Sequence, residues 1–239
     1  MIKEYGCIGR KLVHSYSVPV HNMLADYEYV LNPMEPYELE EFMTEKKFKG
    51  INVTIPYKQD VIKYLDYIDS QADEIGAVNT VVNADGVLKG YNTDAFGMTE
   101  LIKKAGIAIK DKNVLILGTG GTSKTALYVC NTLGAKSVVR VSRGKKDNVI
   151  TYEEAYTLCH DTQVIINCTP VGMFPDNLGK TPVDIDLFPR LEGAVDAVYN
   201  PLRSQLVLEC EKKGIKALGG LYMLVMQAVG AVKLFTGED

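Results

Sequence analysis

A glycine-rich turn in the middle of the chain carries the clearest chemical signal, which is the binding of a phosphate. An apolar run over Asn113–Leu117 is long enough for a buried strand and ends at Gly118. Gly120 and Gly121 let the backbone come close to a ligand, and a helix-compatible segment begins at Ser123. A helix N-terminus at such a turn suits an anion. The context predicts that a dinucleotide binds here by its pyrophosphate, although many such turns are only structural.

Basic residues follow the next expected strand, Ser137–Val141, where the adenosine ribose of a dinucleotide would lie. The segment Ser142–Lys146 contains Arg143, Lys145 and Lys146 and holds no acid. An NAD-specific fold places an Asp or Glu there for the ribose 2′-OH, whereas guanidinium and ammonium groups suit a 2′-phosphate. The sequence therefore favours NADP over NAD, and the alternative is a solvated basic loop.

Hydroxyl groups near the N-terminus could bind a carboxylate. In the segment His14–Ser17, an extended backbone would place the side chains of Ser15 and Ser17 on one side. Two hydroxyls in that arrangement can hold a carboxylate by short hydrogen bonds. A serine pair of this kind is more often a cap or a turn.

Three further polar segments could line a cleft. Asn52–Lys58 ends a strand and starts a helix, with Pro56 at the break, so that Thr54 and Lys58 could both face the cleft. The alternative for Lys58 is a surface lysine whose stem packs on apolar neighbours. The polar strand ends at 77–80 and 90–94 would meet at one edge, and spacing alone favours Asp94 as a helix cap.

The elements that would position these residues alternate regularly after Gly106. The expected strands are Asn113–Leu117, Ser137–Val141, Gln163–Asn167, Ala194–Val198 and Lys216–Leu218. The expected helices are Ser123–Leu133, Tyr152–Cys159 and Ser204–Lys213, and an irregular connector covers Met173–Pro189. This alternation predicts an α/β fold with a Rossmann-type, doubly wound parallel sheet.

The first part of the chain is also α/β but is built differently. Its expected strands are Tyr5–Ile8, Tyr27–Leu31, Gly50–Ile55 and Thr80–Val82, and its expected helices are Glu35–Lys46 and Lys58–Leu65. Asn83–Gly86 predicts a hairpin, because Asp-Gly supplies the positive φ angles of a tight turn. A helix over Thr93–Ala105 would cross to the second domain, and an apolar helix over Gly220–Phe235 would pack back against the first.

Two domains with a cleft between them follow from this order of elements. We expect a substrate-binding and catalytic domain over residues 1–95 and a cofactor domain over residues 96–219. Residues 220–239 would form the returning C-terminal helix. A chain of 239 residues suits one or two domains of this kind.

The composition excludes several classes of protein. Hydrophobic residues make up 46%, charged residues 23%, and the net charge is −4 without a long basic run, so we expect no nucleic-acid partner. No apolar segment is long enough to span a bilayer, so we expect no membrane partner. The five cysteines are scattered and never spaced as Cys-x-x-Cys, which fits a reducing cytoplasm. His14, His21 and His160 lack partners at ligand spacing, so we expect no metal site.

Taken in order, these segments resemble the shikimate dehydrogenase family along nearly the whole chain. Besides the glycine turn, the matching segments are His14–Ser17 with His21 and Asn22, Gly50–Lys58, Gly76–Thr80, Gly90–Asp94, Asn167–Met173, Tyr199–Pro201 and Met223–Ala228. Some positions depart from the family pattern. Lys11 stands where the family usually has proline, the proline after the second serine is displaced to Pro19, and the chain is shorter between Asn22 and Gly50.

The resemblance implies roles residue by residue. Ser15 and Ser17 would hold the substrate carboxylate, and Lys58 and Asp94 would be the catalytic pair. The residues that contact the ring hydroxyls would be Thr54, Lys58, Asn79, Asp94 and Gln227, with Tyr199 close by. The NADP-binding residues would be Gly118, Thr119, Gly120, Gly121 and Thr122 for the pyrophosphate, Ser142, Arg143 and Gly144 for the 2′-phosphate, and Gly220 beside the nicotinamide.

The implied activity is the interconversion of 3-dehydroshikimate and shikimate by hydride transfer with NADP, a step toward chorismate and the aromatic amino acids. Lys58 is the candidate acid/base, and the sequence leaves open whether it accepts a proton or polarises a hydroxyl as a cation. One alternative is a dehydrogenase for quinate or an amino-substituted shikimate. Another is a non-catalytic nucleotide-binding module, which would have no need of a Lys–Asp pair. The sequence is compatible with a monomer or a homodimer.

Overall fold

The computed structural model describes residues 4–12, 16–144 and 148–237. The chain divides into two compact units. Unit 1 comprises Met1–Phe96 and Val225–Asp239, and unit 2 comprises Gly97–Leu224. The boundaries fall inside two helices, α4 (Thr93–Lys104) and α8 (Leu221–Thr236). Within the described ranges, no helix combines the length and the apolar character that crossing a membrane requires.

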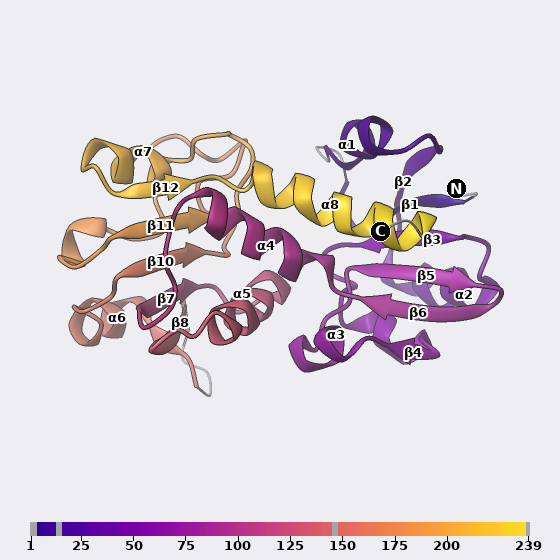
Figure 1. The fold of residues 1–239 in the computed structure, drawn as a ribbon, viewed down its shortest axis with the longest axis horizontal. Coiled ribbons are helices and arrows are strands. Elements are labelled where there is room, and N and C mark those ends of the chain that lie inside the picture. Colours follow the sequence, from indigo (N-terminus) through magenta and orange to yellow (C-terminus); the bar gives the residue numbers. More distant parts are fainter. Residues whose placement is uncertain (1–3, 13–15, 145–147, 238–239) are drawn as a thin grey trace. The chain divides into compact units, whose positions relative to one another are not determined.

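Unit 2 contains the expected parallel sheet. Its strands, given in sheet order, are β12 (Lys216–Leu218), β11 (Gly193–Asp196), β10 (Val164–Asn167), β7 (Asn113–Leu117), β8 (Ser137–Ser142) and β9 (Ile150–Thr151). All neighbouring pairs are parallel, and Figure 1 shows the arrowheads from β12 to β7 pointing the same way. The central strands are nearly continuous apolar runs, because both faces of such a sheet are covered. The predicted α/β fold class is confirmed.

Two of the three helices that follow in unit 2, α6 (Tyr152–Leu158) and α7 (Gln205–Lys212), begin at side-chain caps. The third is α5 (Gly121–Thr132), and a 3₁₀ helix lies over Ile185–Leu187 in the otherwise irregular connector. The side chain of Thr151 accepts from the N–H of Glu154, whose carboxylate accepts from the N–H of Thr151. The strand expected over Ala194–Val198 is in fact β11, which ends at Asp196. It stops there because the Asp196 side chain, rather than a neighbouring strand, accepts from the N–H of Val198.

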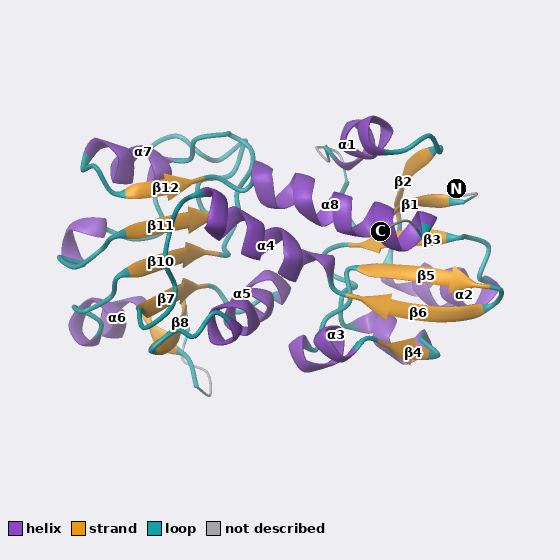
Figure 2. Cartoon of the chain, in the orientation of Figure 1, coloured by secondary structure: helices purple, strands orange, loops and turns teal. Residues whose placement is uncertain are grey.

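Unit 1 contains a mixed sheet. Its strands, in sheet order, are β2 (Tyr29–Pro33), β1 (Tyr5–Gly9), β3 (Gly50–Val53), β5 (Thr80–Ala84), β6 (Val87–Tyr91) and β4 (Tyr67–Ile68). Strands β1, β2 and β3 are parallel, whereas β3–β5 and β5–β6 are antiparallel, as Figure 2 shows for β5 and β6. The predicted hairpin is confirmed, since Asp85 and Gly86 have φ angles of 52° and 89°.

The helical segments of unit 1 depart from the sequence predictions. They are α1 (Ser17–Leu24), a 3₁₀ helix (Pro36–Glu38), α2 (Leu39–Glu45), a second 3₁₀ helix (Asp60–Tyr64) and α3 (Ser70–Ile75). The extended segment expected to include Ser17 is wrong at that residue, because Ser17 begins α1. The helix expected over Lys58–Leu65 is the shorter 3₁₀ helix, in which Leu65 bonds to the third residue before it. Lys58 precedes this helix in a turn.

The C-terminal part of α8 belongs to the core of unit 1. The ring of Phe235 lies against that of Tyr5, with centroids 5.3 Å apart, and joins a buried cluster with Cys7, Tyr29 and Ala231. A Cβ atom on Gly50 would lie 2.4 Å from the Phe235 ring, so this position of β3 must be glycine for the ring to fit. The predicted return of the last helix to the first domain is confirmed.

Candidate active site

A buried ion pair joins Lys58 and Asp94 in unit 1. Lys58 Nζ lies 2.5 Å from Asp94 Oδ2, and the two side chains are 15% and 9% exposed. An ion pair that is largely removed from water needs close geometry to offset the cost of desolvation. The short contact between Nζ and Oδ2 supplies that geometry.

The loop that carries Lys58 is anchored on both sides. Tyr57 is 1% exposed, and its hydroxyl donates to the carbonyl of Met34 at 2.6 Å. The carbonyl of Lys58 accepts from the N–H of Val78 at 2.8 Å, while the N–H of Thr54 donates to the carbonyl of Ile8 at 2.9 Å. These bonds fix the backbone on either side of the lysine, so its ammonium group has a defined position.

Asp94 lies in the first turn of α4 but does not cap it. The cap is Asn92, whose Oδ1 accepts from the N–H of Ala95 at 3.2 Å and whose Nδ2 donates to the carbonyl of Ala77 at 2.8 Å. The capping role that spacing favoured for Asp94 is therefore wrong. Because Asn92 caps the helix, the carboxylate of Asp94 is directed to Lys58, and its charge is favourable at a helix N-terminus.

Asn79 is bonded to the residue that precedes Asp94. Its Oδ1 accepts from the Thr93 N–H at 2.7 Å and from Thr80 Oγ1 at 3.0 Å, and its Nδ2 donates to Thr93 Oγ1 at 3.0 Å. Thr80 Oγ1 also accepts from Asn52 Nδ2 at 3.1 Å. We refer to Asn52, Asn79, Thr80 and Thr93, all buried, as the Asn79 network. A satisfied buried network specifies one geometry, so it fixes the start of α4.

The Asn79 network continues to helix α1 through aromatic side chains. Tyr29 donates from its hydroxyl to Asn52 Oδ1 at 2.7 Å, and the ring of His21 stacks on Tyr29 with centroids 3.8 Å apart. Nδ1 of His21 lies 2.7 Å from the hydroxyl of Tyr27. Burial lowers the pKa of His21 to about 4, so the ring is neutral at pH 7. Sequence reasoning missed this connection, although a polar Asn52 in an apolar strand was a signal.

The other predicted substrate residues lie in several places. Ser15, like His14, lies outside the described residues, and Ser17 is partly buried at the first position of α1. Thr54 is partly buried directly after β3. Gln227 is 8% exposed in the part of α8 that belongs to unit 1. A Cβ atom on Gly230, one turn later, would lie 3.3 Å from Thr93, so this face of α8 lies at the start of α4.

The predicted phosphate-binding turn joins β7 to α5 in unit 2. Gly118 has a φ angle of 105°, and a Cβ atom there would lie 3.2 Å from Thr169 Cγ2, so glycine is required for two reasons. Ser123 is buried, and its hydroxyl donates to the carbonyl of Gly118 at 2.6 Å. In the dinucleotide-binding pattern Gly-x-Gly-x-x-Gly, Ser123 stands at the third glycine position, and its bond to Gly118 closes the turn. Sequence reasoning did not assign this role to Ser123.

The geometry of the turn fits a pyrophosphate. Gly120 precedes α5 without a side-chain cap, and a Cβ atom on it would meet nothing within 4 Å. Gly120 is thus exposed at the N-terminus of α5, the kind of position at which an anion can bind. Thr119 and Thr122 are partly buried at the same turn, as is Gly121 at the first position of α5.

The predicted 2′-phosphate residues follow the neighbouring strand. Leu117 of β7 pairs with Val141 of β8, so the turn and the end of β8 lie at the same edge of the sheet. Arg143 and Gly144 are exposed there, and the hydroxyl of Ser142 donates to the carbonyl of Gly144. An exposed guanidinium at this position fits a 2′-phosphate. The predicted Lys145 and Lys146 lie outside the described residues.

Gly220 has a packing role of its own. A Cβ atom there would lie 2.3 Å from the carbonyl oxygen of Ala197, so no larger residue fits. Gly220 and the partly buried Tyr199 both belong to unit 2. Among the residues described, no group of three or more His, Cys, Asp or Glu side chains is placed to hold a metal ion.

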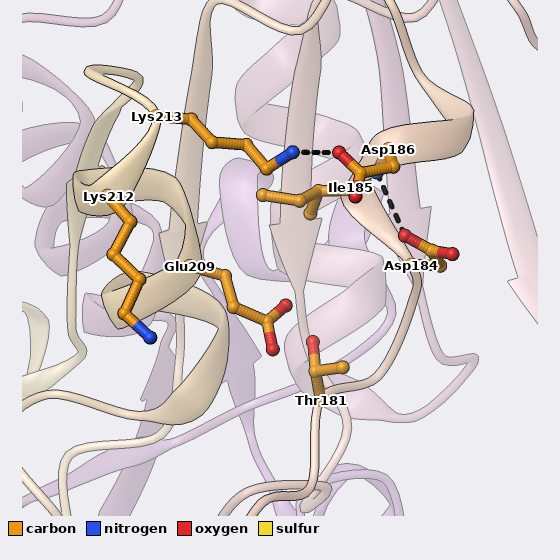
Figure 3. A pocket seen from close by; sticks show the side chains of 7 residues that line it. All are labelled: Thr181, Asp184, Ile185, Asp186, Glu209, Lys212 and Lys213. Atoms are coloured by element: carbon orange, nitrogen blue, oxygen red, sulfur yellow. Dashed lines mark hydrogen bonds and ion pairs between the residues drawn. The ribbon is translucent and has the colours of Figure 1, made fainter.

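A surface pocket of unit 2 lies away from these residues. It has a volume of about 260 Å³ and is lined by Thr181, Asp184, Ile185, Asp186, Glu209, Lys212 and Lys213 (Figure 3). Lys213 forms an ion pair with Asp186. The two lysines lie at the C-terminal end of α7, whereas the residue before its first turn is bonded to the carboxyl end of β11. The pocket is thus at the opposite end of α7 from the edge that carries the glycine turn.

Comparison with known proteins identifies the family. Residues 7–81 match the family model described as the shikimate dehydrogenase substrate binding domain. A curated relative from Methanosphaera stadtmanae, named shikimate dehydrogenase (NADP(+)), is 35% identical over 98% of this chain and 91% of its own length. The chain belongs to the shikimate dehydrogenase family.

Solved structures of the family have the same fold. A chorismate mutase/shikimate 5-dehydrogenase fusion protein from Clostridium acetobutylicum is 35% identical, with a TM-score of 0.91 over 99% of this chain and 92% of that chain. A shikimate 5-dehydrogenase from Thermus thermophilus, in complex with NADP(H) and shikimate, is 30% identical, with a TM-score of 0.87 over 99% and 94%. The two-unit α/β architecture is therefore that of the family.

Proposed function

We propose that this protein is an NADP-dependent shikimate dehydrogenase that interconverts 3-dehydroshikimate and shikimate by hydride transfer. The observation that carries the proposal is the buried Lys58–Asp94 pair, held by the Asn79 network, in a chain of this family. In this proposal residues 1–95 form the substrate and catalytic domain, residues 96–219 form the NADP domain, and residues 220–239 form the returning helix. The small-molecule substrate is thus a ring carrying hydroxyls and a carboxylate.

Each predicted residue has a role in the proposal. Ser15 and Ser17 hold the carboxylate, and Lys58 and Asp94 are the catalytic residues. The ring hydroxyls are contacted by Thr54, Asn79, Gln227 and Tyr199. The turn at 118–122 holds the pyrophosphate, the segment 142–144 holds the 2′-phosphate, and Gly220 lies beside the nicotinamide. The open space at Gly120 supports the assignment of the pyrophosphate site.

The ion pair suggests how the proton is handled. NADP supplies or accepts the hydride when it is bound. In the reducing direction, the Lys58 ammonium gives a proton to the carbonyl oxygen as that oxygen gains charge, and in the other direction Nζ takes the proton back. Asp94 Oδ2, which lies 2.5 Å from Nζ, holds the lysine side chain in place. Orienting the lysine in advance lowers the entropic part of the barrier.

Replacing Lys58 tests the catalytic assignment. We expect Lys58→Ala to lower kcat with shikimate and NADP⁺ by about 100-fold or more, with little change in KM for shikimate, because the proton carrier is lost while most binding groups remain. The measurement is NADPH formation by absorbance. Lys47→Ala is the matched control, because Lys47 forms only an exposed ion pair with Glu45. A large rise in KM with an intact kcat would refute the catalytic assignment of Lys58. If the wild type turns over quinate faster than shikimate, quinate is its preferred substrate.

Arg143 tests the choice of cofactor. We expect Arg143→Ala to raise KM for NADP⁺ by about 10- to 100-fold, the range that the loss of a hydrogen bond to a charged group implies, with little change for NAD⁺. Steady-state kinetics with both dinucleotides make the measurement, and the exposed Arg190→Ala is the control. Equal losses with the two cofactors would contradict a 2′-phosphate contact.

The proposal also covers location and assembly. We propose a cytoplasmic protein, which is supported by five cysteines that are all unpaired. Both a monomer and a homodimer are consistent with this function. Light scattering after gel filtration distinguishes them.

A further inference from the structure

A second buried carboxylate, Asp196, lies at the carboxyl end of β11 in unit 2. It is 0% exposed. Its Oδ1 accepts from Asn167 Nδ2 and from the Val198 N–H, both at 2.9 Å, and its Oδ2 accepts from Ser204 Oγ at 2.5 Å. We call Asn167, Asp196, Val198 and Ser204 the Asp196 network. None of these residues is assigned a role in the reaction above.

The Asp196 network joins segments that follow three neighbouring strands. Asn167 ends β10, and its Oδ1 accepts from the N–H of Thr169 at 3.0 Å and from its hydroxyl at 2.7 Å. Val198 follows β11, and its carbonyl accepts from the N–H of Gly220, after β12, at 2.8 Å. Ser204 accepts from the N–H of Val207 and so caps α7. The carboxylate of Asp196 therefore links the ends of β10 and β11 directly, and it links the end of β12 through Val198.

The turn at Gly219 and Gly220 lies directly against the loop that this network holds. A Cβ atom on Gly220 would lie 2.3 Å from the Ala197 oxygen, and one on Gly219 would lie 2.5 Å from the Leu202 oxygen. Backbone packed this closely cannot move independently. A shift of the loop after β11 would therefore move Tyr199, which it carries, together with Gly220.

The order of the sheet indicates which part of a dinucleotide would lie here. Strand β8 lies on one side of β7, and β10, β11 and β12 lie on the other. The glycine turn follows β7, and Arg143 follows β8, so the adenosine end belongs on the β8 side. A dinucleotide crosses such a sheet at this point, which places its other end beside β10, β11 and β12.

We propose that Asp196 is a positioning residue for the nicotinamide end of the cofactor, because it fixes the loop of Tyr199 against the turn of Gly220. This proposal rests on the proposed NADP site. Asp196 acts through these neighbours and does not itself touch the ligand. Its side chain is enclosed by the three donors of its network.

The hydrogen-bond partners of Asp196 determine which substitution should preserve the bonds of the Asp196 network. All three donors are neutral, and burial raises the pKa of Asp196 to about 6. Burial raises the pKa of two nearby thiols, Cys168 after β10 and Cys210 in α7, and the charge of Asp196 raises both further. A protonated carboxyl can donate to Ser204 Oγ, and so can the amide of an asparagine. Alanine can replace none of these bonds.

Calorimetric titration with two ligands tests the proposal without any turnover. Adenosine 2′,5′-bisphosphate carries the adenosine and the 2′-phosphate but no nicotinamide. We expect Asp196→Ala to weaken NADP⁺ binding by about tenfold and to leave the binding of the bisphosphate within about twofold. Asp196→Asn should retain NADP⁺ binding within about threefold, since it keeps the bonding pattern. The exposed Asp184→Ala, which removes a carboxylate that also accepts a backbone N–H, is the control.

The pattern of losses decides the outcome. Equal weakening of both ligands, or no change in a folded Asp196→Ala, overturns the proposal. If circular dichroism shows that Asp196→Ala is unfolded, Ser204→Ala decides instead, because it removes one of the three bonds to Asp196, together with the cap of α7, and the same selective loss is expected at about threefold. A wild type that binds NADP⁺ but forms no NADPH with shikimate contradicts the proposed function, while the two-ligand comparison still tests Asp196.

Discussion

Among the residues that the structure describes, each unit has one buried side-chain carboxylate, and the two carboxylates have different partners. Asp94 in unit 1, with its side chain 9% exposed, forms an ion pair with Lys58. Asp196 in unit 2 is 0% exposed and accepts from an amide, a hydroxyl and a backbone N–H. Burial disfavours a charge in both places, but only Asp94 has a cation to compensate.

This difference separates chemistry from positioning. A carboxylate beside an ammonium group can hold that group where a proton has to be transferred. A carboxylate among neutral donors instead keeps those donors, and the segments they come from, in register. The polar residue types are similar in the two networks, so the presence of the lysine distinguishes their roles.

Making the same substitution at both carboxylates should give the largest contrast. We expect Asp94→Asn to lower kcat by about 100-fold or more, because Lys58 loses the group that holds it. Asp196→Asn should lower kcat by only a few-fold, since an amide keeps the network bonded. Steady-state kinetics with shikimate and NADP⁺ measure both. Similar losses in the two variants would show that the two carboxylates do not differ in role.

The stability of unit 2 should depend on the charge of Asp196. The folded pKa, about 6, lies above the ordinary value of 3.8, so the folded state is favoured below pH 3.8 and loses that advantage as the pH rises through 6. Asp196→Asn stays neutral, and its free energy of unfolding relative to wild type should rise by about 2 kcal/mol between about pH 4 and pH 7. Urea unfolding at the two pH values measures this. If the difference in free energy of unfolding between the variant and wild type is the same at both pH values, Asp196 does not carry a buried charge.

His21 in unit 1 should give the opposite dependence on pH. Its folded pKa of about 4 lies below the ordinary 6.5, so its contribution to stability is present above pH 6.5 and is lost as the pH falls through 4. His21→Phe keeps a ring on Tyr29 but cannot titrate. We expect it to be less stable than wild type by about 1 kcal/mol near pH 7, through loss of the bond to Tyr27, and more stable near pH 5. Tyr27→Phe is the control, and its difference from wild type should not change sign.

The sequence patterns predicted correctly those elements whose geometry depends on residues close together in the chain. The glycine turn at Gly118 and the hairpin at Asp85 need particular backbone angles, and the alternation after Gly106 needs only periodicity. The path of the chain around Lys58 was less predictable. The helix that follows it is 3₁₀ and shorter than expected, because tertiary bonds such as Tyr57 to Met34 fix this region.

The buried networks could not be read from spacing. Asp94 and Lys58 are 36 residues apart, and Asp196 and Asn167 are 29 apart, so only the folded sheet brings them together. The residue types at the Lys58–Asp94 pair could be inferred from the resemblance to a family. Asp196 stood in an apolar segment as an unexplained acid, and that was the signal available for it.

The fit of Phe235 against Gly50 also bears on how the protein is made. Unit 2 is a continuous stretch of chain. Unit 1, in contrast, needs the segment from residue 225 onward, whose Phe235 packs against Gly50 of β3. On the ribosome, the first sheet therefore emerges early but stays uncovered until the last helix is synthesised. We expect unit 2, though translated later, to complete its folding before unit 1 does.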